Sequence, residues 1–256
     1  MKTSNTPDIL APASGADAWT LHEFPSVVST NLVARTLTPW EAVRADIQTG
    51  GYGRTGRTWV SDRGGLWLSA VLPTPGSAAR WSILPLAAGW AVIEALDSLG
   101  VKDLRIRWPN DIMLGSRKLA GLLLERFSPD TAVIGLGLNV FNHPAAADPA
   151  LAGAVVSLAE LLPSPGSLAE ITAAMLTALR DVHQVLLHDG FTRIAADLSA
   201  RRMSSTLVEL TLNGHHTPLR GRFRGIDENG RLRLTTVDGV RGSFAAHQVA
   251  LLRELG

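Results

Sequence analysis

Residues 48–59 contain the densest group of side chains that could do chemistry. Four glycines, at positions 50, 51, 53 and 56, share this stretch with Arg54 and Arg57. Glycine lets a backbone come close to a ligand, and the planar guanidinium of arginine suits carboxylate and phosphate groups. A glycine-rich loop with arginines and no acidic residue is typical of an anion-binding site. A purely structural loop is the alternative, because glycines also serve ordinary turns.

The same loop matches the glycine spacing of dinucleotide-binding proteins at Gly51, Gly53 and Gly56. In those proteins the glycines open a helix, and an acidic residue follows about 20 positions later. Here a turn and a predicted strand over 66–72 follow the loop, and no acidic residue stands at the required distance. The lysine of a Walker sequence is also absent, so the sequence favours neither type of nucleotide site.

Three further short stretches carry residues that could take part in catalysis or binding. Residues 107–111 read Arg-Trp-Pro-Asn-Asp, residues 118–121 read Lys-Leu-Ala-Gly, and residues 135–140 read Gly-Leu-Gly-Leu-Asn-Val. Glycine inside a strand often marks the close approach of a ligand or a second backbone. Taken alone, Asp111 would be a turn aspartate and Lys118 a solvated surface lysine.

Strands and helices are interspersed in the first 200 residues, and only strands are expected afterwards. Apolar patterning predicts strands over 19–24, 42–48, 66–72, 104–107, 112–114, 118–125 and 131–140. Helical spacing, capping residues and terminal glycines predict helices over 29–36, 78–99, 157–161, 167–188 and 191–200. Asn-Gly and Asp-Gly turns then separate strands predicted over 207–212, 219–226, 232–237 and 242–246. The pattern favours an α+β fold, with a mixed β-sheet flanked by helices and a small C-terminal β-barrel.

Composition narrows the class of protein. The 256 residues are 46% hydrophobic with a net charge of +1, so bulk electrostatic binding to nucleic acid or membrane is not expected. There is no cysteine, which excludes disulfides and fits a cytoplasmic protein. No apolar run approaches the length of about 20 residues that a membrane helix needs. The seven histidines show no metal-binding spacing, and we interpret them as surface residues.

Five motifs, in order across about residues 19–142, resemble the biotin protein ligases (biotin–[acetyl-CoA-carboxylase] ligases). The family pattern is Ser-Thr-Asn, Gln-Thr-x-Gly-x-Gly-Arg-x-Gly-Arg-x-Trp, Lys-Trp-Pro-Asn-Asp, Lys-Leu-Ala-Gly and Gly-x-Gly-x-Asn. This chain carries the five motifs at 29–31, 48–59, 107–111, 118–121 and 135–139. The resemblance implies a flexible lead-in over 1–18, a biotin ligase catalytic domain over 19–203 and an SH3-like β-barrel over 204–256.

The resemblance implies an ATP-dependent ligase. Such an enzyme converts biotin and ATP to biotinyl-5'-AMP and pyrophosphate. It then transfers biotin to a lysine of a biotin carboxyl carrier protein or domain of acetyl-CoA carboxylase or a related carboxylase. Two anions meet in the first step, so cations must lie between them. Mg²⁺ is expected to arrive with the phosphates of ATP. A homodimer is a further possibility, because dimers are common in the family.

The resemblance also assigns roles to individual residues. Lys118 would contact the biotin carboxylate and the α-phosphate, Asp111 would act as a base or orienting partner, and Arg54 would close the loop. The implied biotin-binding residues are Ser29, Thr30, Asn31, Gln48, Gly51, Tyr52, Gly53, Arg54, Lys118 and Gly121. The implied ATP-binding residues are Arg54, Arg57, Trp59, Arg107, Asn110, Lys118 and Asn139. Ser29 and Thr30 could instead only cap the helix that follows them.

Two positions depart from the family pattern. Tyr52 stands where the family usually has arginine, which removes one cation, and Arg107 replaces a lysine but keeps its charge. These changes leave open a catalytically impaired biotin-binding module. A lipoate or octanoate ligase or transferase, with a related catalytic domain, is the nearest enzyme alternative, although the loop and the Trp-Pro-Asn-Asp motif favour biotin. Only about 20 residues precede the first predicted strand, so we expect no DNA-binding domain and no specific DNA binding.

Overall fold

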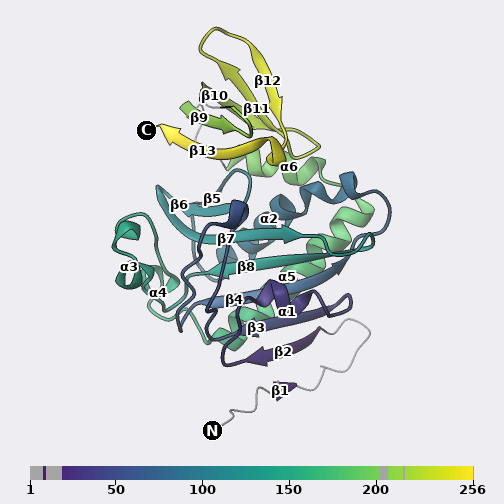
Figure 1. Cartoon of the computed structure of the whole chain (residues 1–256), viewed down its shortest axis with the longest axis vertical. Coiled ribbons are helices and arrows are strands. Elements are labelled where there is room, and N and C mark those ends of the chain that lie inside the picture. Colours follow the sequence, from purple (N-terminus) through teal and green to yellow (C-terminus); the bar gives the residue numbers. More distant parts are fainter. Residues whose placement is uncertain (1–7, 10–18, 202–206, 216, 256) are drawn as a thin grey trace.

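Two β-sheets build the protein (Figure 1). The computed structural model describes residues 8–9, 19–201, 207–215 and 217–255. The larger sheet has eight strands and the smaller sheet has five, within the described part of the chain. The smaller sheet contains only residues from the C-terminal quarter and lies at one end of the larger one, beside β5 (Leu104–Arg107) and α6 (Thr192–Ala200).

The larger sheet is mixed. Its strands, in spatial order, are β1 (Asp8–Ile9), β2 (Thr20–Phe24), β3 (Glu41–Ala45), β4 (Leu66–Pro73), β8 (Thr131–Leu138), β7 (Arg117–Glu125), β6 (Asp111–Leu114) and β5. The strands β2 and β3 are parallel, and every other neighbouring pair of described strands is antiparallel. A parallel pair needs a crossover, and α1 (Thr30–Ala34) lies in the connection between β2 and β3.

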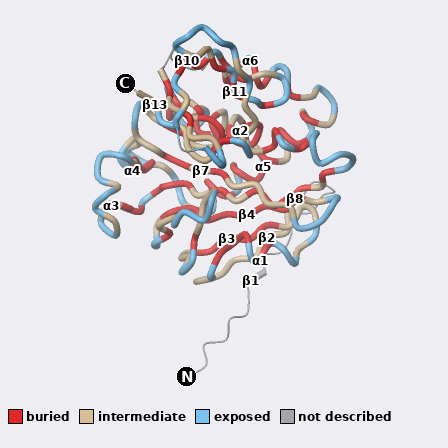
Figure 2. Tube along the Cα trace, turned by 45° about the horizontal axis from the view of Figure 1, so that its top comes forward, coloured by how far each residue is buried: buried red, intermediate tan, exposed pale blue. Residues whose placement is uncertain are grey.

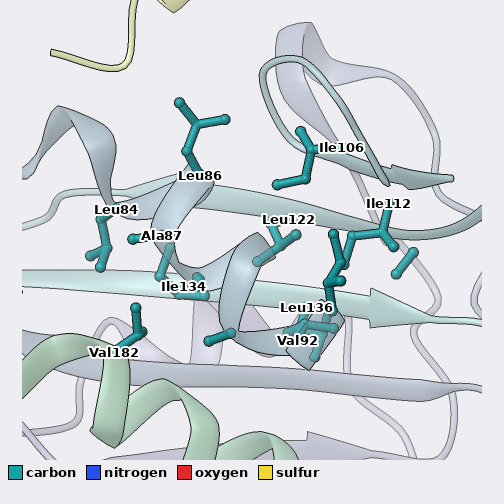
Figure 3. Packing of buried hydrophobic residues seen from close by; sticks show 14 of the residues in the cluster. Leu84, Leu86, Ala87, Val92, Ile106, Ile112, Leu122, Ile134, Leu136 and Val182 are labelled. Carbon is teal, nitrogen blue, oxygen red and sulfur yellow. The ribbon is translucent and has the colours of Figure 1, made fainter. Parts of the chain in front are cut away.

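The two faces of this sheet have different partners because strand side chains alternate between faces. On β8, Ala132, Ile134 and Leu136 belong to the main core with the long helices α2 (Leu84–Ser98) and α5 (Leu168–His188). Figure 3 shows side chains of α2 packed against these strands. Val133 faces the other way and packs in a smaller cluster that includes Ala34 of α1. The second face of the sheet, which carries α1, is the one left with room for a ligand site.

The smaller sheet is entirely antiparallel in its described strands. Their spatial order is β12 (Arg241–Phe244), β11 (Leu232–Thr236), β10 (Leu219–Ile226), β9 (Leu207–Leu212) and β13 (Val249–Leu255). The predicted turns at Gly214, Gly230 and Gly239 all have positive φ, at 77°, 72° and 84°. Their glycines relieve the strain that a side chain would meet there. Buried residues of this sheet join the main core, so both sheets share one apolar interior (Figure 2).

Most of the predicted elements are present, with some corrections. The helix predicted over 78–99 begins as a 3₁₀ segment, Ala78–Ile83, before α2. The connection after β8 contains α3 (Pro144–Ala147), a 3₁₀ turn at Pro149–Leu151 and the predicted helix α4 (Leu158–Leu161). The strands β1 and β13 were not predicted. The expected lead-in over 1–18 lies outside the described residues except for β1, and the expected domain boundary near 203 also lies outside them.

One histidine contradicts the prediction that all histidines lie on the surface. His183 of α5 is 1% exposed, and its ring stacks on Trp81 with centroids 5.1 Å apart. Its Nε2 lies 2.7 Å from the carbonyl oxygen of Pro73. Burial lowers the pKa of His183, so the neutral form fits this position in the core. Among the described residues, no helix has the length and apolarity that crossing a membrane requires.

Candidate active site

A cavity of about 280 Å³ opens on the sheet face that carries α1. Its walls come from the N-terminus of α1, the loop after β3, the strands β7 and β8, and the C-terminal strand β13. Every candidate site residue predicted from the sequence lines this cavity, except Gly51. Residues up to 110 positions apart in the predicted motifs are therefore brought together around one space.

The glycine-arginine loop forms a small hairpin and does not open a helix. Gly53 N donates to Arg57 O over 2.7 Å, and Trp59 N donates to Gly51 O over 2.9 Å. The tip at Arg54–Gly56 is a 3₁₀ turn. A Cβ on Gly51 would lie 2.8 Å from the Trp59 carbonyl oxygen, so Gly51 allows this tight pairing even though its atoms do not line the cavity. This geometry agrees with the prediction that the loop is not a dinucleotide-binding site.

Polar side chains gather where α1 meets the sheet. Gln48 Oε1 lies 2.8 Å from Thr30 N and 3.0 Å from Thr30 Oγ1, and Gln48 Nε2 donates to Ser61 Oγ over 2.9 Å. Ser69 Oγ lies 2.7 Å from Thr30 Oγ1 and 2.6 Å from Asn31 Oδ1. Ser29 occupies the N-cap position but makes no side-chain capping bond. The capping alternative for Ser29 and Thr30 is therefore not what the geometry shows.

Lys118 is aimed at the cavity by a β-bulge. Asp111 pairs with Gly121 and Ile112 with Ala120, but the next partner of β6 is Lys118, so the register shifts at Leu119. Leu119 and Ala120 are both fully buried in the core. Without the extra residue, Lys118 would share the core face with Ala120; the bulge re-aims its side chain to the other face.

Lys118 and Asp111 form an ion pair at the cavity wall. Lys118 Nζ lies 2.7 Å from Asp111 Oδ1, and Arg107 Nη2 lies 2.7 Å from Asp111 Oδ2. The exposed fractions of the Lys118 and Asp111 side chains are 22% and 18%. Burial lowers the pKa of Lys118, although Asp111 opposes this change. Burial alone would raise the pKa of Asp111, but Lys118 and Arg107 outweigh it and hold that pKa below its usual value.

Trp59 lies over the two glycine-containing strands. Lys118 Nζ is 4.5 Å from the centre of its ring, within the range of a cation–π contact. A Cβ on Gly137 would lie 2.6 Å from Trp59 Nε1, and a Cβ on Gly121 would lie 3.2 Å from Trp59 Cζ3. Both glycines therefore make room for the indole. Within the described part of the chain, the buried Trp59 Nε1 has no hydrogen-bond partner.

Arg54 joins the loop to the smaller sheet. Its Nη2 donates to the carbonyl oxygens of Ala246 and Val249 over 2.7 and 3.1 Å. In Figure 1 the dark blue segment between β3 and β4 runs across the larger sheet toward β13. Burial lowers the pKa of Arg54, whereas Arg57 is exposed. Residues 250–252 of β13 also line the cavity.

The two candidate asparagines are held by internal hydrogen bonds. Asn139 is 2% exposed, and its Nδ2 donates to Val156 O over 3.2 Å. Asn110 Nδ2 donates to Leu122 O over 2.7 Å. These amides fix the backbone at the edge of the cavity, while their ATP-binding roles stay predictions. In the described residues, no group of three or more His, Asp or Glu side chains is arranged to hold a metal ion.

Sequence reasoning missed several residues that shape the site. Ser69 and Glu125 bond to predicted site residues, but each looks like an ordinary strand residue and belongs to no motif. Their alternation with buried neighbours is the one signal that could have placed them on the cavity face. The contribution of β13 carried no signal, because that strand was not predicted. Other cavity residues outside the motifs are Pro144, Leu151 and Val155.

Comparison with solved structures defines the class of fold. The chain aligns with the biotin protein ligase of Aquifex aeolicus, solved with biotin and ATP, with a TM-score of 0.78 and 24% identity, over 92% of this chain and 99% of that one. It also aligns with the biotin protein ligase of Leishmania major, solved with biotin, with a TM-score of 0.63 and 23% identity, over 91% and 100% of the two chains. The fold is that of the biotin protein ligases.

Sequence comparison places the chain in a family. Residues 27–139 match the model of the biotin/lipoate A/B protein ligase family. The biotin–[acetyl-CoA-carboxylase] ligase of Mycobacterium tuberculosis is 33% identical over 196 residues, which cover 73% of this chain and 70% of that protein. The chain therefore belongs to the biotin/lipoate A/B protein ligase family. The bifunctional ligase/repressor BirA of Bacillus subtilis is 29% identical over 80% of this chain, and the match spans 64% of that relative's length.

Proposed function

We propose that the protein is a biotin protein ligase. It activates biotin with ATP to biotinyl-5'-AMP and pyrophosphate, then transfers biotin to a specific lysine of a biotin carboxyl carrier protein or domain. The observation that carries this proposal is Lys118, a bulge-directed lysine paired with Asp111 inside the cavity. It faces the space between the polar group at Thr30 and Gln48 and the arginine loop. The family membership and the biotin- and ATP-bound relatives of the same fold support the choice of substrates.

In the first step, a carboxylate oxygen of biotin attacks the α-phosphorus of ATP. A new P–O bond forms, the bond to the β-phosphate oxygen breaks, and pyrophosphate leaves with the electron pair. Both reactants are anionic, so the charges of Lys118, Arg54 and Arg57 reduce their repulsion and stabilise the charge that develops. The burial that lowers the pKa of Lys118 also strengthens its interactions with both anions.

In the second step, the amine of a carrier lysine attacks the carbonyl carbon of the adenylate. An amide bond forms, the bond between the acyl carbon and the phosphate oxygen breaks, AMP leaves with the electron pair, and the proton lost by the amine passes to solvent. Asp111 is better suited to orient that amine than to remove its proton, because its pKa lies below the usual value and its oxygens already face Lys118 and Arg107. The loop over the cavity, with Trp59 at its base, would keep water away from the adenylate.

The remaining predicted site residues divide between the two substrates. Residues 29–31, Gln48, 52–54 and Gly121 would bind biotin, with Gly51 supporting the loop behind them. Arg57, Trp59, Arg107, Asn110 and Asn139 would bind ATP. Trp59 would contribute through its ring, because its buried Nε1 lies against Gly137 of β8. Mg²⁺ would be held mainly by ATP phosphates and water, because Asp111 is already engaged by two cations.

The carrier would belong to acetyl-CoA carboxylase or a related carboxylase, and the protein would act in the cytoplasm without binding specific DNA. A homodimer is compatible with this assignment. The chain would divide into a catalytic domain up to about residue 203 and a barrel domain after it, although their apolar residues meet in one core.

The decisive experiment measures pyrophosphate release by the purified protein with ATP and Mg²⁺, in the presence of biotin, of lipoate, or of neither. Release that requires biotin is expected. Release with lipoate alone would instead identify the protein as a lipoate ligase, a class that the description of the matched family also includes. Tight biotin binding without release would instead support an impaired binding module, with Tyr52 and Arg107 as the responsible changes.

A further inference from the structure

Tyr52, the loop residue that departs from the family pattern, makes a specific contact across the cavity. Its Oη donates to Glu125 Oε2 over 2.9 Å, and Asn31 Nδ2 donates to the same oxygen over 2.7 Å. The three residues come from the loop, the end of β7 and the start of α1. One carboxylate oxygen therefore ties the loop to two elements that are part of the folded core.

The acceptor side of this contact is rigid. Asn31 is 3% exposed, and its Oδ1 lies 2.6 Å from Ser69 Oγ on β4. A Cβ on Gly135 of β8 would collide with the Asn31 amide, so the strand approaches Asn31 as closely as glycine allows. Glu125 thus receives its first hydrogen bond from a side chain that packing has already fixed, and it can present the oxygen to Tyr52 at a set position.

The donor side suits a loop that must be held without a ligand. Tyrosine has two side-chain torsions to fix, fewer than arginine, so ordering it costs less conformational entropy. The charged and titratable groups around it are Glu125 and Arg35, with the Ser29 hydroxyl also near. Burial, together with the bond to Glu125, raises the pKa of Tyr52 to about 12, so its proton is present throughout the neutral range. The loop backbone on both sides is already paired, since Tyr52 bridges to Thr58.

We propose that Tyr52, Glu125 and Asn31 form a clasp that holds residues 50–59 against the sheet before any ligand binds. Tyr52 is then a positioning residue, which acts by slowing the escape of the bound acid and its adenylate. The identity of that acid as biotin rests on the proposed function, but the clasp itself does not.

The clasp is tested first in the ligand-free protein. Hydrogen–deuterium exchange of the amides of residues 50–59 is compared between the wild type, Tyr52→Phe and Glu125→Gln. Loss of a hydrogen bond to a charged acceptor should speed exchange in this segment by about tenfold in Tyr52→Phe. Glu228→Gln, at an exposed turn of the smaller sheet, is the matched control and should change nothing in the loop. Unchanged exchange in Tyr52→Phe would overturn the proposal.

A spectroscopic measurement separates the specific bond from a general effect on packing. Tyr52 is the single tyrosine of the chain, so ¹³C-labelled tyrosine gives one ring Cζ resonance. Its chemical shift should move in Glu125→Gln, because the acceptor of the phenol proton has changed from charged to neutral. It should stay in place in Glu228→Gln. An unchanged Cζ chemical shift in Glu125→Gln would show that the hydrogen bond does not exist in solution.

The consequence for ligand retention is tested with labelled biotin. Its dissociation rate should rise about tenfold in Tyr52→Phe, while the maximal rate of pyrophosphate release changes less. Tyr52→Arg, which can pair with Glu125, should restore slow dissociation only when Glu125 is present. If biotin fails to bind the wild type, the proposed function fails while the exchange result still stands. If biotin binds but leaves all variants at the same rate, the retention role is wrong and the function survives.

Discussion

Lys118 carries the charge on which the proposed first step depends. Two opposing effects act on the pKa of Lys118. Burial disfavours the charged ammonium, whereas the carboxylate of Asp111 at 2.7 Å favours it. The pair is also the reason why the lysine is ordered, since a free lysine side chain would sample many rotamers. A lysine placed in this way can act at a fixed point in the cavity.

Replacing Lys118 with alanine should reduce biotin-dependent pyrophosphate release by about 10²- to 10³-fold, because one preorganised cation is lost where charge develops. Lys102→Ala is the matched control, since Lys102 is exposed and pairs with Asp97 outside the cavity. Far-UV circular dichroism would show that both variants fold. Activity of Lys118→Ala within a few-fold of the wild type would contradict the role given to this residue.

Replacing Asp111 with asparagine should change the pH dependence of the first step. Lys118 acts in its protonated form, and Asp111 raises the pKa that burial lowers. Removing the carboxylate therefore lowers the pKa of Lys118 further. The loss of activity on the alkaline side should therefore begin at a lower pH than in the wild type.

The test is a pH profile of pyrophosphate release from pH 6 to 10.5. Asp97→Asn, which removes the partner of the exposed Lys102, is the control and should leave the profile unchanged. An alkaline limb at the same pH in Asp111→Asn and the wild type would mean that Asp111 does not support the charge of Lys118.

At this scale, the sequence predicted the site residues through their motifs, not their contacts. Lys118 and Asp111 were singled out, but their direct ion pair and the share of Arg107 in it were not. Glu125 was not predicted as a site residue, because a glutamate at the end of a strand is common and belongs to no motif. The partner that makes it informative, Tyr52, lies 73 positions away in the chain.

Among the elements, β8 and β7 shape the cavity through their glycines, because Gly137 and Gly121 leave room for Trp59 against the sheet. The alternation of β8 places Ile134 and Leu136 in the core and Gly135 and Gly137 on the cavity face. The glycines were recognisable from the sequence as a mark of close approach. What approaches them, Asn31 at one and Trp59 at the other, required the structure.

Gly137→Ala should disturb the cavity and leave the core intact. The new Cβ would lie 2.6 Å from Trp59 Nε1 and Cε2, so the indole must shift from its present position. Overpacking of this kind costs about 1 to 3 kcal/mol, here mainly as displacement of a side chain at the cavity wall. We expect pyrophosphate release at low biotin concentration to fall at least about tenfold, the kinetic equivalent of 1.4 kcal/mol.

A double variant identifies the collision as the cause. Trp59→Phe removes the Nε1 and Cε2 atoms that the new Cβ would meet, so the effects of Gly137→Ala and Trp59→Phe should be less than additive. Strict additivity would place the effect of the glycine elsewhere.

The bulge on β7 shows why the predicted strands alone did not give the direction of the Lys118 side chain. The strand was predicted over 118–125 and lies at Arg117–Glu125. A regular strand would give Lys118, Ala120 and Leu122 the same face, which is the core face of the sheet. The extra residue at Leu119 reverses this for Lys118, and nothing in the local pattern of apolar residues predicts it. The same limitation applies to β13, which becomes a strand only by pairing with β9.

At the scale of the whole molecule, the smaller sheet helps to complete the cavity. Its strand β13 lines the cavity, and the carbonyl groups of Ala246 and Val249 receive Arg54. Two further contacts fix the sheet in place: Trp108 Nε1 donates to Gly230 O over 2.9 Å, and Arg105 pairs with Glu254. The loop that covers the cavity is thus anchored at one end on β7 through Tyr52 and at the other on the smaller sheet through Arg54.

Arg105 and Glu254 provide a test of this coupling. The guanidinium meets the carboxylate through two hydrogen bonds of 2.6 Å, and the exposed fractions of the two side chains are 13% and 17%. Arg105→Gln would leave the Glu254 carboxylate half-buried without its partner, which costs about 1 to 3 kcal/mol of unfolding free energy. Because Glu254 lies on β13, we also expect faster hydrogen exchange at residues 249–255 and slower pyrophosphate release, although Arg105 does not line the cavity.

The matched variant is Arg220→Gln, which breaks a pair with Glu209 on the same sheet. The side chain of Arg220 is 63% exposed, and Glu209, which is 11% exposed, keeps a second cation because Arg253 Nη1 lies 4.0 Å from its other oxygen. The stability and activity of Arg220→Gln should therefore stay close to those of the wild type. Denaturant unfolding measures the first effect and biotin-dependent pyrophosphate release the second. Arg105→Gln could unfold more easily and still keep full activity. The pair would then stabilise the smaller sheet, but the sheet would not position the loop. Loss of activity together with faster exchange in both β13 and residues 50–59 would instead trace the coupling from Glu254 through β13 to Arg54.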